Sequence, residues 1–251
     1  MSIEMVSASV ITVPAFTDTV NQAHHFFGTR QHTVEHDLKI GIPLQGVQGA
    51  APSAWMLSVK QVHGTEALVV DRALSAADRF EGGWDALVTD QPGVMVAVRT
   101  ADCVPILMHD PTHGVVAAIH AGWRGAVEAI VPKTLALLEA RFGSNPKQIR
   151  LSIGPSAGVC CYEVDDPVLE RLRQGGGNWE KVVRFQGEGK AKLDLKGLIK
   201  EQAVAYGAAP QAITTVNLCT ICHEDLFFSY RREGKVNGTM ISAIGLPPKR
   251  R

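Results

Sequence analysis

The sequence lacks most of the features that would set it apart from an ordinary folded globular protein. Its 25 basic residues balance 25 acidic residues, so it has no excess of positive charge of the kind that attracts nucleic acid or anionic membranes. No apolar run approaches the roughly 20 residues that a membrane-spanning helix needs. The short basic segment PPKRR, at 247–251, is interpreted as a solvated terminus. We therefore expect neither a nucleic-acid partner nor a membrane partner.

A disulfide framework and an export signal are also missing. The opening stretch MSIEMVSASVITVPAF has no basic leader, carries Glu4 early and is broken by Pro14, which does not match a secretory signal. The cysteines are few and odd in number, at positions 103, 160, 161, 219 and 222. We therefore expect a cytoplasmic protein whose cysteines are thiols or metal ligands.

The remaining composition is typical of one folded domain with a sizeable core. Apolar residues make up 45% of the 251 residues and charged residues 20%, close to the average for soluble globular proteins. The sequence has no internal repeat, and the glycine-rich stretch RQGGGNWE, at 173–180, is interpreted as a surface loop and not a linker. We expect a single domain over 1–251.

Short apolar runs alternate with helical patterns along the chain. The runs predict buried strands at 94–98, 104–108, 114–120, 149–154, 181–185, 212–218 and 240–246. Because Pro105 has no amide hydrogen, it must lie at the edge of a sheet or among the first residues of its strand. Helical spacing predicts helices at 166–173 and 195–207. The fold class is therefore α/β or α+β.

A further amphipathic helix follows the turn Gly-Trp-Arg-Gly and ends near Phe142 and Gly143. Pro132 lies inside its apolar pattern, and an interior proline breaks or kinks a helix. Two interpretations stay open: the helix begins later than Ala126, or it is kinked at Pro132.

Three residues at strand ends have the chemistry of a metal site. Cys103 ends the stretch RTADC, His120 ends an apolar run, and His63 precedes a glycine in KQVHG. Alone, each is more simply a buried thiol, a core histidine or a loop histidine. Together, two imidazoles and one thiolate form the ligand set of catalytic zinc, which leaves its fourth position open. A hairpin from Cys103 to His120 would bring those two to one sheet edge, and the residues alone leave the metal and the core interpretations equally open.

A second cysteine motif, Cys219-Thr-Ile-Cys222-His223, has the spacing of a c-type haem attachment site. That interpretation requires an exported protein. A structural zinc requires a second ligand pair at comparable spacing, which the adjacent pair Cys160 and Cys161 does not offer. We therefore favour two thiols in a tight turn. The following FFSYRREG could bind a carboxylate or phosphate, or form a structural ion pair.

Six segments in order, KQVHG, DALVTD, TADCVPIL, HAGWRG, IGPSAGVCCYEV and LCTICHEDLFFSYRREG, resemble the YfiH-type family, also called the laccase-domain or multicopper polyphenol oxidase family. The resemblance covers about residues 24–246. It implies a four-layer α/β/β/α fold, similar to that of the cytotoxic necrotizing factor catalytic domain. It also implies a single metal site formed by His63, Cys103 and His120, with zinc as the metal and copper as the alternative.

The family includes purine nucleoside phosphorylases, so the resemblance implies phosphorolysis of adenosine, inosine, guanosine or methylthioadenosine, with adenosine deamination as a companion activity. Its N-terminal arginine corresponds to Arg30, a contact for phosphate or substrate, although Gly28 departs from the family spelling. Asp102 is expected to contact substrate or orient a ligand. Thr239 stands where relatives commonly have an arginine, which weakens an anion-binding role for that loop. His109, His113 and His223 are expected to be structural.

Two further activities in the same family stay open. One is a hydrolase that removes a wrong amino acid from the peptidoglycan precursor UDP-MurNAc. The other is copper-dependent phenol oxidation, which ranks last because the ligand set is too sparse for a multicopper oxidase. In each case the partner is a small molecule. Whether the protein is a monomer or a dimer is not determined by the sequence.

Overall fold

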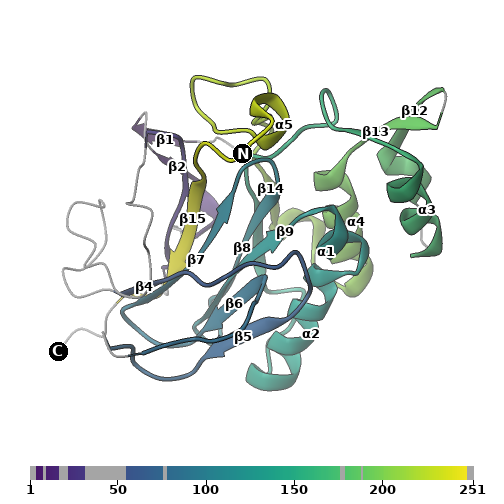
Figure 1. Ribbon diagram of the computed structural model, residues 1–251. Helices are drawn as coiled ribbons and strands as arrows, with labels where there is room; N and C mark the ends of the chain where they lie inside the picture. Colours follow the sequence, from purple (N-terminus) through teal and green to yellow (C-terminus); the bar gives the residue numbers. More distant parts are fainter. Residues whose placement is uncertain are drawn as a thin grey trace.

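Two six-stranded sheets form the centre of the computed structural model, which describes residues 4–7, 10–16, 22–31, 55–75, 78–175, 179–187 and 189–247. They lie against each other, and a group of helices covers the outer face of one of them (Figure 1). The basic tail, apart from Pro247, lies outside the described residues, as do 176–178 of the predicted glycine-rich loop.

The first sheet has the order β1-β2-β3-β15-β7-β4. Its strands are β1 (Glu4–Ser7), β2 (Val10–Thr12), β3 (His24–Gly28), β15 (Met240–Gly245), β7 (Val94–Thr100) and β4 (Trp55–Leu57). The short 3-10 helix η1 (Pro14–Phe16) follows β2. All the described strand pairs of this sheet are antiparallel except β4 with β7, which is parallel.

The second sheet has the order β14-β10-β8-β9-β6-β5. Its strands are β14 (Ile213–Thr215), β10 (Arg150–Ile153), β8 (Val104–Asp110), β9 (Val115–Ala121), β6 (Ala86–Thr89) and β5 (Ala67–Val70). Every residue of β8 and β9 is buried, because one face of these strands packs on helices and the other on the first sheet. Burial on both faces explains why these strands read as continuous apolar runs.

The helical layer begins directly after β9. Helix α1 (Trp123–Val127) is followed by α2 (Ile130–Phe142), and Ala129 between them has a left-handed backbone with φ of 64°. Pro132 is the third residue of α2, where a missing amide hydrogen costs nothing. Of the two interpretations left open, the later start is the one observed.

The other helices are α3 (Asp166–Gln174), α4 (Leu195–Tyr206) and α5 (Tyr230–Glu233). Two more 3-10 helices are η2 (Trp179–Val182) and η3 (Pro210–Ala212). A small sheet of β11 (Glu163–Val164), β13 (Lys190–Leu193) and β12 (Val183–Gly187) extends beyond the helical layer in Figure 1. No helix within these described ranges combines the length and the apolar content that crossing a membrane requires.

The predicted mixed α/β fold is confirmed, and the predicted strands and helices are found with small shifts. Two predicted strands were too long: 181–185 begins as the 3-10 helix η2, and 212–218 is a strand only at β14. Among the described residues, the buried cluster on the outer face of the first sheet comes from its strands β3, β4, β7 and β15.

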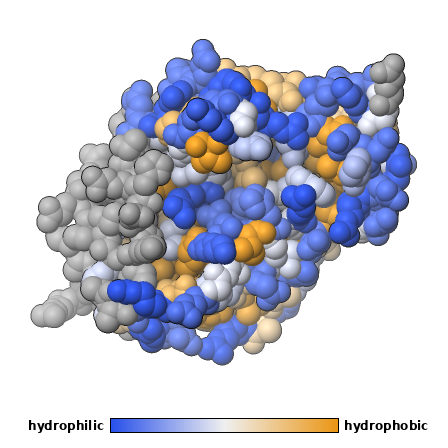
Figure 2. Space-filling view, viewed as in Figure 1, coloured by the Kyte–Doolittle hydropathy of each residue, from blue (hydrophilic) through white to orange (hydrophobic). Residues whose placement is uncertain are grey.

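The face of the molecule shown in Figure 2 is largely hydrophilic where it is coloured, and hydrophobic residues form separate small patches on it. Within the described ranges, the exposed large hydrophobic residues are Val62, Phe185, Val204, Tyr230 and Val236. Two of these, Tyr230 and Val236, line the cavity described below.

Candidate functional site

The β8–β9 hairpin brings Cys103 and His120 to the same edge of the second sheet. Pro105 is paired with His120, and Val104 with Ala121, so Cys103 lies directly beside the end of β9. This is the arrangement that the hairpin prediction required. Pro105, near the start of its strand, is compatible with the pairing because the first residues of a strand tolerate a missing amide hydrogen.

His63 reaches this edge from the loop between β4 and β5. Its backbone is left-handed, with φ of 62°, a conformation that costs a non-glycine residue free energy and is concentrated at functional sites. The Asp85 carboxylate supports the strained loop, since it accepts hydrogen bonds from the backbone amides of His63, at 3.0 Å, and Gly64, at 2.6 Å.

The ligand atoms of His63, Cys103 and His120 all lie within 4.8 Å of one another. The two imidazole rings meet edge to face, with centroids 4.8 Å apart. Gly122 makes this close approach feasible, because a Cβ there would lie 2.9 Å from Cδ2 of His63 and 3.2 Å from Sγ of Cys103. A His₂Cys donor set fits a borderline-soft divalent ion such as zinc. These residues therefore form a candidate metal centre.

The electrostatics of the centre favour the thiolate form of Cys103 and the protonated form of His120. Burial opposes ionisation of Cys103, but hydrogen bonds from His120 and His63 lower the pKa of the thiol to about 7. Burial likewise opposes the imidazolium of His120, yet hydrogen bonds to Asp85 and Cys103 raise its pKa to about 9. A divalent cation would thus displace the proton in the hydrogen bond between His120 and Cys103.

Asp85 is the functional residue that sequence reasoning missed. Its carboxylate is fully buried and accepts a hydrogen bond from Nδ1 of His120 at 2.7 Å, which leaves Nε2 to bind a metal. Burial raises the pKa of Asp85, but the hydrogen bonds from His120 and Gly64 outweigh it and lower the pKa overall. The family segment DALVTD begins at Asp85, but the sequence alone gives this carboxylate no partner and therefore no role.

A cavity of about 410 Å³ opens onto the three ligands. Its walls carry aromatic and cationic side chains as well as the metal ligands. These aromatic and cationic residues are Arg99, Trp123, Arg124, Tyr162, Tyr230 and Arg231. Thr239 also lines the cavity.

Asp102 lines the cavity, but its carboxylate accepts hydrogen bonds from other groups of the protein. It accepts hydrogen bonds from Thr220 Oγ1 at 2.6 Å, Ser229 Oγ at 2.9 Å and the Arg231 amide at 2.7 Å. Its own backbone is left-handed, with φ of 90°. Asp102 therefore holds the turn that presents Cys103.

The structure does not bring Arg30 to this cavity. Its guanidinium donates to the Glu224 carbonyl and lies over the Phe228 ring, 4.8 Å from its centroid. Neither His109 nor His113 belongs to the metal centre: His109 is fully buried in β8, and His113 donates to Asp110 at 2.7 Å. His223 is not in the three-residue group either.

Several known proteins are similar to this chain in sequence or in fold. The chain is 38% identical over 190 residues to a protein of Bacteroides thetaiotaomicron named purine nucleoside phosphorylase, covering 73% of this chain and 70% of that one. It is 37% identical over 191 residues to adenosine deaminase RL5 from an unknown prokaryotic organism, covering 74% and 72%. The crystal structure of the Bacillus licheniformis protein YfiH has a TM-score of 0.83 and 28% identity, with 97% of this chain and 98% of that chain covered.

A family model described as multi-copper polyphenol oxidoreductase laccase matches residues 44–247, which include the three ligands, Asp85 and the lining of the cavity. The resemblance that the motifs carry is thereby confirmed over most of the chain. The chain belongs to the multi-copper polyphenol oxidoreductase laccase family, the YfiH-type family.

Proposed function

We propose that this protein is a zinc-dependent purine nucleoside phosphorylase, with adenosine, inosine, guanosine and methylthioadenosine as its substrate class. The observation that carries the proposal is the three-residue ligand group at a cavity of about 410 Å³ whose walls offer both arginines and aromatic rings. The relatives named purine nucleoside phosphorylase support the same activity. A cytoplasmic, single-domain protein without nucleic-acid or membrane partners remains part of the proposal.

His63, Cys103 and His120 would hold the ion as neutral imidazoles and a thiolate. Zinc, when bound by three protein ligands, supplies an open coordination position and Lewis acidity. Copper is the alternative that the family's name suggests. Asp85 fixes the tautomer and orientation of His120, and Gly122 provides the space that the ligands need.

The cavity arginines are suited to phosphate. Arg124 stacks on Trp123, 4.5 Å from the ring centroid, and Arg231 lies over Tyr162 at 4.9 Å, so both guanidinium groups are held in place. Together with Arg99 they would neutralise phosphate charge through charge-assisted hydrogen bonds. The phosphate contact expected of Arg30 is assigned in this proposal to these cavity arginines, because Arg30 is not among the residues that line the cavity.

The aromatic side chains are suited to the purine. Tyr162, Trp123 and Tyr230 line the same cavity, and flat rings stack on a nucleobase regardless of its exocyclic groups. Stacking would therefore admit adenine, hypoxanthine and guanine alike. Asp102 acts in this scheme as a positioning residue for the turn that carries Cys103.

Adenosine deamination is the second activity that a specific observation favours, because one relative is named adenosine deaminase. Editing of UDP-MurNAc and phenol oxidation rest on the family alone. Each of the four activities yields a different product, so one set of incubations separates them.

The decisive experiment uses purified protein of measured zinc content. Adenosine is incubated with and without phosphate, and the products are identified by mass. Adenine plus ribose 1-phosphate, formed only with phosphate, is the expected result; inosine would show the deaminase activity. Absence of nucleoside turnover, with release of an amino acid from UDP-MurNAc or oxidation of a phenol, would refute the proposal. Cys103→Ala should abolish turnover, whereas His113→Gln, outside the cavity, should retain it.

A further inference from the structure

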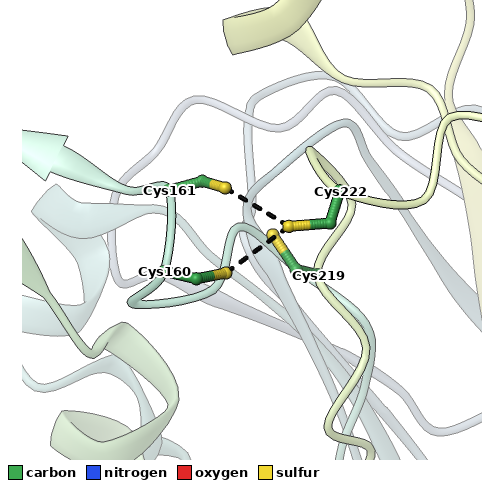
Figure 3. Close-up of side chains that lie close together, drawn as sticks. All are labelled: Cys160, Cys161, Cys219 and Cys222. Atoms are coloured by element: carbon green, nitrogen blue, oxygen red, sulfur yellow. Dashed lines mark hydrogen bonds between the residues drawn. The ribbon is translucent and has the colours of Figure 1, made fainter.

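Four of the five cysteines converge outside the cavity (Figure 3). Cys160 and Cys161 belong to a turn between β10 and β11, and Cys219 and Cys222 to a turn between β14 and α5. Sγ of Cys222 lies 3.6 Å from Sγ of Cys160 and 3.3 Å from Sγ of Cys161. All four sulfurs lie within 4.8 Å of one another. These residues are called the four-cysteine cluster below.

Cys219 and Cys222 lie in a turn after β14, as expected. The adjacent pair Cys160 and Cys161 lacks the sequence spacing of a familiar second ligand pair. Folding nonetheless brings it opposite the first pair, and both of its side chains point toward Cys222 (Figure 3). A c-type haem would require sulfurs that face a macrocycle, and His223 is not part of the cluster.

The backbone around the cluster is built for close approach. A parallel bridge pairs Ser156 with Cys219, which holds the two turns side by side. Gly158 lies between them: a Cβ there would lie 3.1 Å from Cβ of Cys219 and 3.2 Å from Sγ of Cys160. The Gly158 amide also donates a hydrogen bond to Sγ of Cys219 at 3.2 Å. Amide donors to sulfur are the outer contacts that stabilise metal-bound thiolates.

We propose that the four-cysteine cluster binds one structural Zn²⁺ ion through four thiolates. Zinc–sulfur bonds of about 2.3 Å in a tetrahedron place the sulfurs about 3.8 Å apart, within the spacing seen here. With four protein ligands the ion has no open position, so the site is structural and distinct from the candidate catalytic centre. Binding converts four thiols to thiolates and releases four protons, with no change of oxidation state.

The surroundings compensate the charge of such a complex. One Zn²⁺ with four thiolates carries two net negative charges. Lys196 is buried and lines one pocket together with Cys160 and Cys219, and its ammonium group donates to the carbonyls of Val216 and Leu218 at 2.8 Å each. Lys192 donates to the carbonyl of Cys161 at 3.3 Å. Two cations therefore lie beside the proposed anionic complex.

The ion would join two walls of the catalytic cavity. Tyr162, which lines the cavity, follows directly after Cys161. Thr220, next to Cys219, donates to the carboxylate of Asp102. Arg232 ties the same turn from its other side, through the carbonyls of Thr220 and Ile221. The zinc would thus fix the position of Tyr162 relative to the Asp102 turn.

The test is a cobalt titration of the reduced, metal-free, full-length protein that carries Cys103→Ala, which removes a ligand of the other centre. We expect one equivalent of Co²⁺ with the strong thiolate-to-metal absorption and the visible bands of a tetrahedral thiolate site, and displacement of both by Zn²⁺. The added substitutions Cys219→Ser and Cys222→Ser should abolish the absorption. His223→Asn, next in the chain but outside the cluster, should leave it unchanged.

A second readout needs no cluster variant. Zinc in excess of its Kd by about a hundredfold should raise the melting temperature of the Cys103→Ala protein by roughly 5–10 °C, and bound zinc should protect four thiols from alkylation. Failure of the reduced, folded Cys103→Ala protein to bind either metal would overturn the proposal. So would an unreduced protein that carries a disulfide within the cluster and no zinc. Neither readout depends on nucleoside turnover, so the proposed function can fail independently.

Discussion

The Asp85 carboxylate and the His120 imidazole are joined by a hydrogen bond of 2.7 Å inside the protein, where Asp85 is fully buried and His120 is only 3% exposed. This pair links the residue directly before β6 to the end of β9. It explains how one imidazole nitrogen is kept available for a metal, because the other carries the proton that Asp85 accepts.

The first prediction concerns this pair. Asp85→Asn should weaken zinc binding by about 10–100-fold, because the amide cannot accept from His120 as strongly and the ligand loses its orientation. Competition with a chelator measures the affinity. Asp110→Asn is a matched control, since Asp110 accepts from His113 and nearby amides in the same way but far from the cavity. Equal zinc affinity in the two variants would contradict the role given to Asp85.

The second prediction concerns the space at Gly122. A methyl group there would approach the His63 ring at 2.9 Å and the Cys103 sulfur at 3.2 Å, so Gly122→Ala must displace a ligand. Overpacking of this kind costs about 1–3 kcal/mol, which should appear as roughly a tenfold to hundredfold loss of zinc affinity. Gly175→Ala is the control, because its Cβ would meet neighbours at 3.5 Å or more. Unchanged zinc affinity in Gly122→Ala would show that the ligands do not need this space.

The third prediction compares two arginines that each stack on an aromatic ring. Arg124 lies over Trp123 and lines the cavity, whereas Arg30 lies over Phe228 and does not. Arg124→Ala should raise the KM for phosphate roughly tenfold or more, the effect of losing one hydrogen bond to a charged group. Arg30→Ala should leave it within about twofold. Initial rates at varied phosphate concentration measure both KM values. A larger increase of KM in Arg30→Ala than in Arg124→Ala would mean that Arg30 makes the phosphate contact.

The fourth prediction concerns a buried histidine outside the site. His109 is fully buried, and neither of its ring nitrogens has a hydrogen-bond partner among the residues that the structure describes. An unpartnered buried polar group costs about 1–3 kcal/mol. His109→Leu, which places an apolar side chain beside Phe16, should therefore raise the free energy of unfolding at pH 7 by about 1 kcal/mol or more in denaturant titrations. A less stable variant would mean that the imidazole contributes more than its burial costs.

The same histidine predicts how stability depends on pH. Burial, with smaller contributions from Arg150 and His25, lowers the pKa of His109 to about 4, although the Asp110 carboxylate acts in the opposite direction. Between pH 6.5 and 4 the unfolded chain therefore binds a proton that the folded protein does not, so wild-type stability falls as the pH falls. The stability advantage of His109→Leu should grow by about 3 kcal/mol across that window. A constant difference from pH 7 to pH 4 would contradict the lowered pKa.

Much of the local structure could be predicted from the chain. The apolar runs of β7, β8, β9 and β15 are recognisable because both faces of these strands are buried. Sequence order also predicted the hairpin that joins Cys103 to His120, since neighbouring strands connected by a short turn pair with each other. The start of α2 could not be predicted, because it depends on the left-handed backbone of Ala129, which no residue type at that position announces.

The contacts across the fold were not available to such reasoning. His63 is forty residues from Cys103, and Cys160 is sixty-two residues from Cys222. Adjacent cysteines do not have the spacing of a familiar ligand pair, so no local pattern marked them as partners of Cys219 and Cys222. Asp85 was overlooked for the same reason, because a carboxylate acquires a role only when its partner is known.

The strand and helix types, the family and the chemistry of the candidate ligands follow from short segments of the chain, because side-chain periodicity and donor atoms are local properties. Which of these groups meet depends on the tertiary packing. Sheet pairing placed Asp85 beside His120, packing made Gly122 the position that leaves room for the ligands, and two distant turns brought four thiols within 4.8 Å of one another. Proximity between distant segments depends on the packing of the whole chain, which no short pattern encodes.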